Sequence, residues 1–312
     1  MSTQTLAELA KRVDEEIVRG VAEDIITINP VFSFIPFMGY AGDGIIVNRE
    51  NALGDAGLYS VGDTITDKTP STVTQTTFTA TKIIGDAEMD GLVQVQGEGD
   101  GVDMLADEIS SKSKSVGRTF QAGIATGTGA TPEVNSLHSL CDSGQFTTAS
   151  AGQALSFALM DELCDLVKAK DGAVDWIMMP ARTLRAFKAL YRALGGTTPT
   201  TVLELPNGTT RTVLMYEDIP VFKNEYLSIV ETANGAALTG GALTSVWAGV
   251  WDDGTRKVGV SAIYPRASSA GIQVQSVGTK EAADEEIWRV KWYTNFASFN
   301  RRGLARLTSI NN

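Results

Sequence analysis

The stretch Gly101–Gly127, GVDMLADEISSKSKSVGRTFQAGIATG, decides the fold class because it predicts one long helix with a narrow apolar stripe. The stripe consists of residues that recur at helical spacing: Leu105, Ile109, Val116, Phe120 and Ile124. Acidic residues precede basic ones, and Glu108 with Lys112 forms a favourable i, i+4 pair. Serines fill the opposite face. A helix of this length extends about 30 Å, so the sequence predicts a mostly exposed strut that meets its core along one seam.

The composition is that of a globular protein, with 312 residues, 43% hydrophobic and 20% charged. The formal net charge of −11 argues against a dedicated nucleic-acid-binding surface, because an acidic chain repels phosphate backbones. Cys141 and Cys164 lie in no metal or redox motif, so we expect two small apolar fillers in a reducing compartment. No leader pattern and no membrane-length apolar run occurs, so no membrane partner is expected.

The N-terminal segment predicts an amphipathic helix over residues 3–26, followed by the dense apolar patch Val31–Tyr40. One interpretation is that this helix docks on the chain's own core. The other is an arm that docks on a neighbouring subunit, because terminal extensions are often poorly held by their own domain. The second interpretation makes three aromatic residues candidate intersubunit contacts: Phe32, Phe34 and Phe37.

Threonines dominate the stretch from Thr64 to Thr81, and the segment Asp67–Ser71, DKTPS, predicts a turn between two strands. Alternation is weak here, so neither face could cover a core, and a lone two-stranded hairpin is marginal in water. The alternatives are a flexible loop and a projecting hairpin that a partner surface stabilises. The candidate contacts of such a hairpin are Thr66, Lys68, Thr74, Thr76, Phe78 and Lys82.

From Ser150 the pattern changes to helices alternating with short strands. Ser150 with Gln153 predicts a capping box before an apolar helix that ends near Gly172. The run Val174–Met179, VDWIMM, predicts a strand that is buried on both faces.

Pro180 then predicts the start of a second helix, which Gly195 ends. Its expected inward residues are Leu184, Phe187, Leu190, Tyr191 and Leu194. A basic stripe lies along another side, consisting of Arg182, Arg185, Lys188 and Arg192. On an acidic chain we interpret this stripe as a solvated or intersubunit face, with phosphate binding as the alternative.

The last third predicts strands only. Asn207-Gly208 is a strong turn signal between TVLEL and TRTVLMY, and further strands are expected at 247–251 and 258–263. The segment Ile287–Ala297 alternates well, so it predicts a long strand that closes a sheet under the strut.

No motif in the sequence points to catalysis, a metal or a cofactor. His138 is the single histidine, and no nucleophile or orienting acid is marked beside it. The glycine runs at 97–101 and 127–129 lack the context of a phosphate-binding loop. Asp252-Asp253-Gly254 lacks the remaining ligands of a calcium loop. We therefore expect no enzyme and no cofactor.

The order of these segments resembles the major capsid proteins of tailed bacteriophages with the Hong Kong 97-type fold. At the level of amino-acid sequence, the resemblance lies in the two stretches VDWIMMPARTLRAFKALYRALGG and DIPVFKNEYL. It implies an α+β fold that is divided as follows: an N-terminal arm at 1–58, an extended β-hairpin loop at 59–98, a peripheral domain with a spine helix at 99–150, an α/β axial domain at 151–270, and return strands of the peripheral domain at 271–312.

The function that the resemblance implies is structural. Subunits of this kind assemble into pentamers and hexamers of an icosahedral shell around double-stranded DNA, without sequence-specific binding. A separate scaffold and a portal protein are expected partners, and the location is the virion capsid, with assembly in the host cytoplasm. The alternatives are an encapsulin-like nanocompartment shell, another virion structural protein, and a soluble enzyme.

Overall fold

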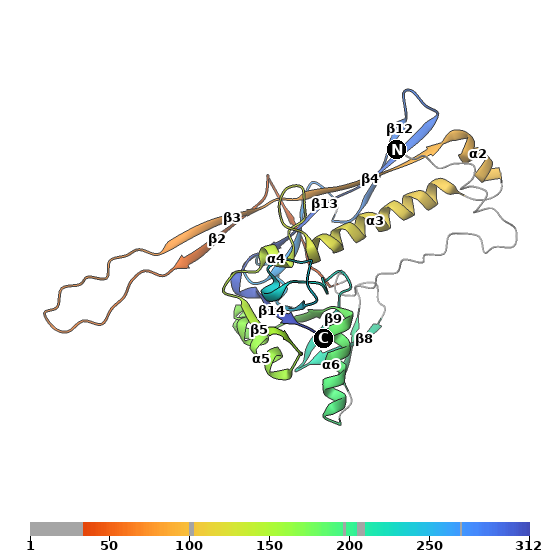
Figure 1. Ribbon diagram of the computed structural model, residues 1–312. Helices are drawn as coiled ribbons and strands as arrows, with labels where there is room; N and C mark the ends of the chain where they lie inside the picture. The colour runs from red at the N-terminus through yellow and green to blue at the C-terminus, as the bar shows by residue number, and fades with distance from the viewer. Residues whose placement is uncertain (1–33, 100–102, 196–197, 205–209, 269) are drawn as a thin grey trace.

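The computed structural model describes residues 34–99, 103–195, 198–204, 210–268 and 270–312. Figure 1 shows three parts: an elongated layer in which a long helix lies along a sheet, a block of sheet and helices beside it, and a thin hairpin that projects away from both. The strands of these parts form a five-stranded sheet, a seven-stranded sheet and a two-stranded ribbon.

The elongated layer is organised on the strand β13 (Glu285–Ser298), which confirms the predicted long C-terminal strand. β13 pairs antiparallel with three strands: β4 (Thr81–Asp90), β12 (Gln273–Thr279) and β11 (Val260–Pro265). β1 (Phe37–Tyr40) adds to β11 in parallel. Each of these partners except β12 is distant in sequence, so β13 ties together segments from the whole chain.

The predicted strut is the helix α3 (Met104–Thr126), which lies along β4 and β13 (Figure 1). Asp103 caps it, because its side chain accepts a hydrogen bond from the backbone N–H of Ala106 at 2.9 Å. The buried end of the predicted stripe packs on β13, with the rings of Phe120 and Trp292 4.7 Å apart in an edge-on arrangement. The expected pair also forms, with Lys112 Nζ 3.7 Å from Glu108 Oε1.

The block consists of a seven-stranded mixed sheet in the order β5-β14-β10-β6-β9-β8-β7. Its strands are β5 (Phe146–Gln153), β14 (Leu304–Ile310), β10 (Thr244–Gly249), β6 (Trp176–Met179), β9 (Ile219–Lys223), β8 (Thr210–Tyr216) and β7 (Thr200–Glu204). β6 is buried on both faces, as predicted: Trp176 and Met178 join the core beneath α3, whereas Ile177 and Met179 face the helices of the block.

Two helices cover the second face of this sheet: α5 (Phe157–Leu166) and α6 (Ala181–Ala193). α6 begins after Pro180, as predicted. The shorter helical elements are α2 (Gly91–Gly99), α4 (Leu137–Leu140), η2 (Ala169–Gly172), η3 (Ala233–Gly235) and η4 (Arg301–Gly303). Gly249 on β10 is required by packing, because a Cβ there would overlap the ring of Trp176.

The projecting ribbon pairs β2 (Ile45–Ala52) with β3 (Thr72–Phe78), and the prediction of its strands was partly wrong. The sequence placed both strands after residue 58, with a turn at Asp67–Ser71. In the structure the first strand is β2, Asp67–Ser71 belongs to the long connection, and β4 joins the sheet of β13. The reason is that the polar alternation of β2, with Asn48, Arg49 and Glu50, gives no core-facing pattern.

Three further expectations differ from the structure. Ser150 and Gln153 lie in β5, and Ser156 caps α5 instead by accepting from the backbone N–H of Leu159 at 3.3 Å. Leu194, expected inside, is exposed because α6 ends at Ala193. The end of the stretch 59–98, which was assigned to the extended β-hairpin loop, forms the helix α2 at Gly91–Gly99. The helix predicted over residues 3–26 lies outside the described residues.

Truncating Phe120 tests the seam between α3 and β13. We expect Phe120→Ala to lower the free energy of unfolding by about 3–5 kcal/mol, because it leaves a cavity against Trp292 and Phe37. Ser111→Ala, on the exposed face of the same helix, should change it by about 0.5 kcal/mol or less. Urea denaturation of the two variants beside the wild type gives the comparison; equal midpoints would contradict the assigned packing.

Candidate functional site

The outer part of the hairpin exposes apolar side chains that the described part of its own chain does not cover. The connection between β2 and β3, residues 53–71, is called the hairpin tip below. Four aliphatic residues of the tip are strongly exposed: Leu53, Leu58, Val61 and Ile65. Only the base of the ribbon is buried, at Ile45, Val47 and Phe78. Uncovered aliphatic groups at the end of a projecting arm are typical of a surface that contacts a partner.

Polar bonds of its own give the tip a defined shape. The Tyr59 hydroxyl accepts hydrogen bonds from the backbone N–H groups of Thr66 and Asp67, both at 2.9 Å. The backbone N–H of Ser60 donates to Asp63 Oδ2 at 2.7 Å, and Asp55 N–H donates to the Thr69 carbonyl at 3.0 Å. The tip is therefore a folded loop that presents its aliphatic side chains outward.

The structure distributes the predicted hairpin contacts over three environments. Thr66 and Lys68 lie in the tip and are exposed. Thr74 is exposed on β3, where Asn51 donates to its hydroxyl, and Thr76 is half-buried on the same strand. Two residues differ from the expectation. Phe78 is buried in its own chain, and Lys82 is exposed on β4 instead of the hairpin.

The aromatic residues expected on the N-terminal arm contact their own chain. The ring of Phe34 lies 5.5 Å from that of Phe222, and Phe37 lies 5.9 Å from Trp292. These two rings are half-buried and pack against the core beneath α3 in their own subunit. Phe32 lies outside the described residues.

The basic side of α6 is divided between buried and exposed residues. Arg182 is half-buried and donates from Nη2 to the carbonyl of Ala242 at 2.9 Å, so it holds a loop of its own subunit. Arg185 is exposed and remains a candidate contact.

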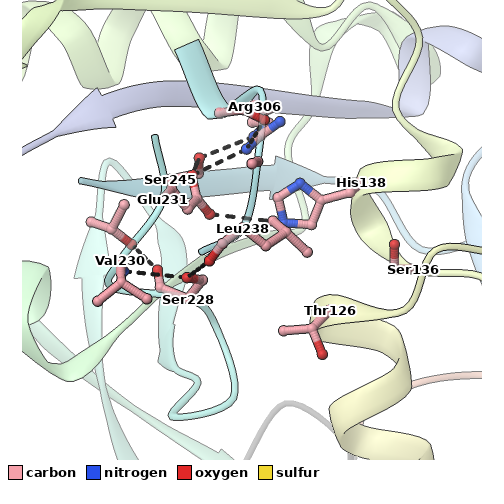
Figure 2. Close-up of polar contacts among 12 residues, drawn as sticks. Thr126, Ser136, His138, Ser228, Val230, Glu231, Leu238, Ser245 and Arg306 are labelled. Atoms are coloured by element: carbon pink, nitrogen blue, oxygen red, sulfur yellow. Dashed lines mark hydrogen bonds and ion pairs between the residues drawn. The ribbon is translucent and has the colours of Figure 1, made fainter. Parts of the chain in front are cut away.

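A buried polar network joins the loops between α3 and the block (Figure 2). Arg306 on β14 donates to Glu231 Oε2 at 3.1 Å and to Ser245 Oγ at 3.0 Å, and Ser245 donates to the same carboxylate at 2.5 Å. The guanidinium also stacks over Trp247 at 5.1 Å. Gly235, with a φ of +60°, lies so close that any Cβ there would overlap the guanidinium. The network therefore fixes the 228–243 loop on the sheet.

His138 lies at the edge of this network and is a core residue. Its ring meets Trp247 edge-on at 4.8 Å, and its Nε2 lies 3.8 Å from Glu231 Oε1. Burial and the charge of Arg306 lower the pKa of His138 to about 3, so the ring is neutral at neutral pH and this approach is not an ion pair.

The geometry gives these residues no catalytic arrangement. Glu231 stands between Ser245 and His138 and accepts the hydrogen bond of the Ser245 hydroxyl, so the imidazole is not placed to deprotonate that hydroxyl. Ser245 is also buried, with 1% of its surface exposed. Burial raises the pKa of both Cys141 and Cys164 to about 12, which keeps the thiols protonated.

Within the described part of the chain, no cluster of three or more histidine, cysteine or acidic side chains is placed to hold a metal ion. No described helix has the length and apolar character needed to cross a membrane.

Sequence reasoning missed the aliphatic part of the tip and the whole buried network. The segment 53–63, LGDAGLYSVGD, does carry a signal, since five apolar residues are interspersed with glycines and acids outside any helix or strand pattern. No local sequence signal marks the pair Arg306 and Glu231, because 75 residues separate them.

The depressed pKa of His138 predicts a pH dependence of stability. An unfolded histidine binds a proton near pH 6.5, whereas the buried one stays neutral to about pH 3, so the unfolded state binds more protons between these values and the stability decreases as the pH is lowered. Between pH 7 and 5 this effect lowers the free energy of unfolding by about 2 kcal/mol. His138→Phe, which keeps an aromatic ring against Trp247, should remove that part of the slope.

The measurement is urea denaturation of both proteins at pH 7, 6 and 5. Glu231 acts in the opposite direction above pH 4.5, because burial raises its pKa, and the difference between wild type and variant isolates the histidine. Parallel slopes would show that His138 is not the buried neutral group described above.

Comparison with known proteins gives matches to solved structures only. No protein-family model and no curated protein matches the chain. The encapsulin of Synechococcus elongatus PCC 7942, solved as a holo complex, has a TM-score of 0.70 at 13% identity, over 99% of this chain and 96% of its own. The cyanophage A-1(L) capsid has a TM-score of 0.67 at 11% identity, over 96% and 97%. The capsid of an empty GTA particle has 0.60 at 12% identity, over 99% of both chains.

These matches extend over nearly the whole length of each chain, and identities this low show the fold alone. They agree with the geometry above: a long helix along a sheet, a separate α/β block and a projecting hairpin. The chain therefore has the Hong Kong 97-type capsid fold, α+β in class, as its sequence predicts.

Proposed function

We propose that this chain is the repeating subunit of a closed icosahedral shell, built from pentamers and hexamers, that encloses double-stranded DNA. The observation that carries the proposal is the hairpin tip, whose exposed aliphatic residues are not covered by the described part of their own chain. The structural neighbours support it, because they are subunits of phage capsids and of an encapsulin.

The energetics of the hairpin favour a partner that is always present. A lone ribbon is marginal in water, and full burial of one aliphatic side chain contributes about 1.5–3 kcal/mol. A second copy of the chain that covers Leu58 and Val61 would therefore stabilise the tip and join the two subunits in a single contact. Self-assembly explains why a soluble composition is combined with such an arm.

The proposed contents and partners follow from charge and from the fold. A net charge of −11 disfavours adhesion of DNA to the shell, which suits enclosure without sequence-specific binding. A separate scaffold and a portal protein are the further partners in this proposal, with assembly in the host cytoplasm and the virion capsid as the final location. No catalytic role is part of it.

A second candidate function is a cellular nanocompartment shell. The observation that favours it is the TM-score of 0.70 to the encapsulin, against 0.67 to the cyanophage capsid. The contents of purified particles separate the two functions: nuclease-protected double-stranded DNA supports the capsid, and one co-purifying cargo protein supports the nanocompartment.

Negative-stain electron microscopy with sedimentation of the purified protein tests the shell itself. We expect closed shells or rings from the wild type. Leu58→Ser with Val61→Ser should abolish them and leave a folded monomer, because the tip loses the groups that a neighbour covers.

The matched control is Leu92→Ser with Val95→Ser on α2, which removes one exposed leucine and one exposed valine at the same spacing away from the hairpin. Shells from the control and none from the tip variant support the role of the tip. A wild type that remains monomeric even when it is co-expressed with its neighbouring genes would contradict the proposed function.

A further inference from the structure

A groove with a cavity volume of about 540 Å³ lies along β2. Its walls come from four segments that are distant in sequence: residues 47–51 on β2, the loop 142–145, the segment 256–257 before β11, and the turn 299–302. Sites for small molecules have volumes of about 300–1,000 Å³. The groove is therefore large enough to hold a compact ligand within a single subunit.

The groove concentrates positive charge on a chain whose net charge is −11. Two carboxylates line it, Glu50 and Asp142. Its cations are more numerous: Arg49, Arg256, Lys257, Arg301 and Arg302. Guanidinium and ammonium groups donate charge-assisted hydrogen bonds to phosphate and carboxylate oxygens. The lining therefore favours an anionic ligand.

Two buried polar atoms of the lining have no hydrogen-bond partner among the described residues. The Nε of Arg49 is a donor without an acceptor, although Nη2 of the same side chain donates to the Ser298 carbonyl at 2.5 Å. The Oε1 of Gln145 is an acceptor without a donor. Since buried polar groups are nearly always hydrogen-bonded, these two atoms point to a ligand that supplies both an acceptor and a donor.

The electrostatics of Arg49 agree with a missing anion. Burial, and then the charge of the nearby Arg301, lower the pKa of the Arg49 guanidinium below its usual value. A negative group in the groove would stabilise the charged form and raise that pKa again.

The walls that carry the other cations are fixed before a ligand arrives. The buried Asp252 accepts hydrogen bonds from the backbone N–H groups of Arg256 and Lys257, both at 3.2 Å. These bonds hold Arg256 in a left-handed conformation, with a φ of +62°. In the neighbouring turn the Asn300 side chain accepts from the backbone N–H of Arg302 at 2.9 Å. A preorganised lining of this kind lowers the entropic cost of binding.

Lys257 and Arg302 are the cations with the most capacity for a ligand. Arg301 Nε lies 3.5 Å from a carboxylate of the groove, and Arg256 Nη2 donates to a backbone carbonyl of β1 at 2.8 Å. Lys257 and Arg302 are exposed, and no side-chain partner of either is found in the described part of the chain.

The unpaired acceptor Gln145 Oε1 distinguishes between classes of anion. An ionised carboxylate offers acceptors only, so it would leave this oxygen unpaired. A terminal phosphate group has a second pKa of about 6, so part of its population keeps a P–OH donor near neutral pH beside several acceptor oxygens. The phosphodiesters of duplex DNA have no P–OH group, and their neighbours along the strand would lie over an acidic chain.

We propose that the groove along β2 binds the terminal phosphate group of a small molecule. Arg49 Nε, Lys257 and Arg302 donate to the phosphate oxygens, and the P–OH group donates to Gln145 Oε1. The site goes beyond the proposed shell function, because it is built within one subunit and its ligand is not the enclosed DNA.

Isothermal titration calorimetry of the full-length protein with inorganic pyrophosphate, at low salt and near neutral pH, tests the site. Lys257→Gln with Arg302→Gln should weaken binding by about tenfold or more, because two charge-assisted donors are lost. The control is Lys188→Gln with Arg192→Gln, which removes the same charge from the basic stripe of α6 and should bind as the wild type does. No binding by the wild type, or an equal loss in both variants, would overturn the proposal.

A second titration tests the assignment to phosphate. Tricarballylate, an ionised tricarboxylate without a P–OH group, should bind the wild type more weakly than pyrophosphate. Gln145→Leu removes the acceptor and should narrow that difference. Equal binding of the two anions to the wild type would show a general anion site and contradict the assignment. A DNA duplex that binds where pyrophosphate does not would show a surface for phosphodiesters and would also overturn it.

The outcome is independent of the proposed function. Calorimetry measures ligand binding whether the protein forms shells or remains monomeric, and negative-stain microscopy of the same samples shows which state is present. Pyrophosphate binding without shells would support the site and leave the shell in question. Shells that bind no pyrophosphate would overturn the site alone.

Discussion

The packing of α3 on β13 is the constraint on which the rest of the subunit depends. Phe120 and Trp292 meet edge-on, and Phe37 closes the same cluster from β1. β13 gathers β4, β11 and β12 around it, so this one seam aligns segments from both ends of the described chain. The core beneath α3 continues to Trp176 and Trp247 of the block, which makes the two layers a single hydrophobic unit. The hairpin is the part that this core leaves out.

The sequence predicted the elements whose pattern is local. α3, α6, β6 and β13 have clear helical or strand periods, and the structure confirms them. β1 and β2 were missed because each forms only against a partner: Phe37 lies opposite Ala262, and Ile45 lies opposite Phe78. The buried network needs the folded sheet to bring Arg306 to Glu231, so no spacing rule could find it.

The predicted contact residues also divide into those that the local sequence placed correctly and those whose exposure depends on the fold. Thr66 and Lys68 were placed in a projecting segment by composition, and the structure exposes both. Phe78, Phe34 and Phe37 were chosen for their apolar character, and the fold uses them inside the subunit. Leu58 and Val61 are among the apolar residues left outside, and they have no periodic pattern to mark them. Exposure depends on what the rest of the chain covers, and that information is tertiary.

The passage from β13 to β14 runs through the turn η4, which holds only three residues. β13 belongs to the elongated layer and β14 lies between β5 and β10 in the sheet of the block, so two strands that are consecutive in the chain join the two sheets. A short turn between two packed strands leaves little room for a hinge. The body of the subunit is therefore a stiff plate with one slender arm, and in the proposed shell any difference in the angle between neighbouring copies would fall on the arm and not on the plate.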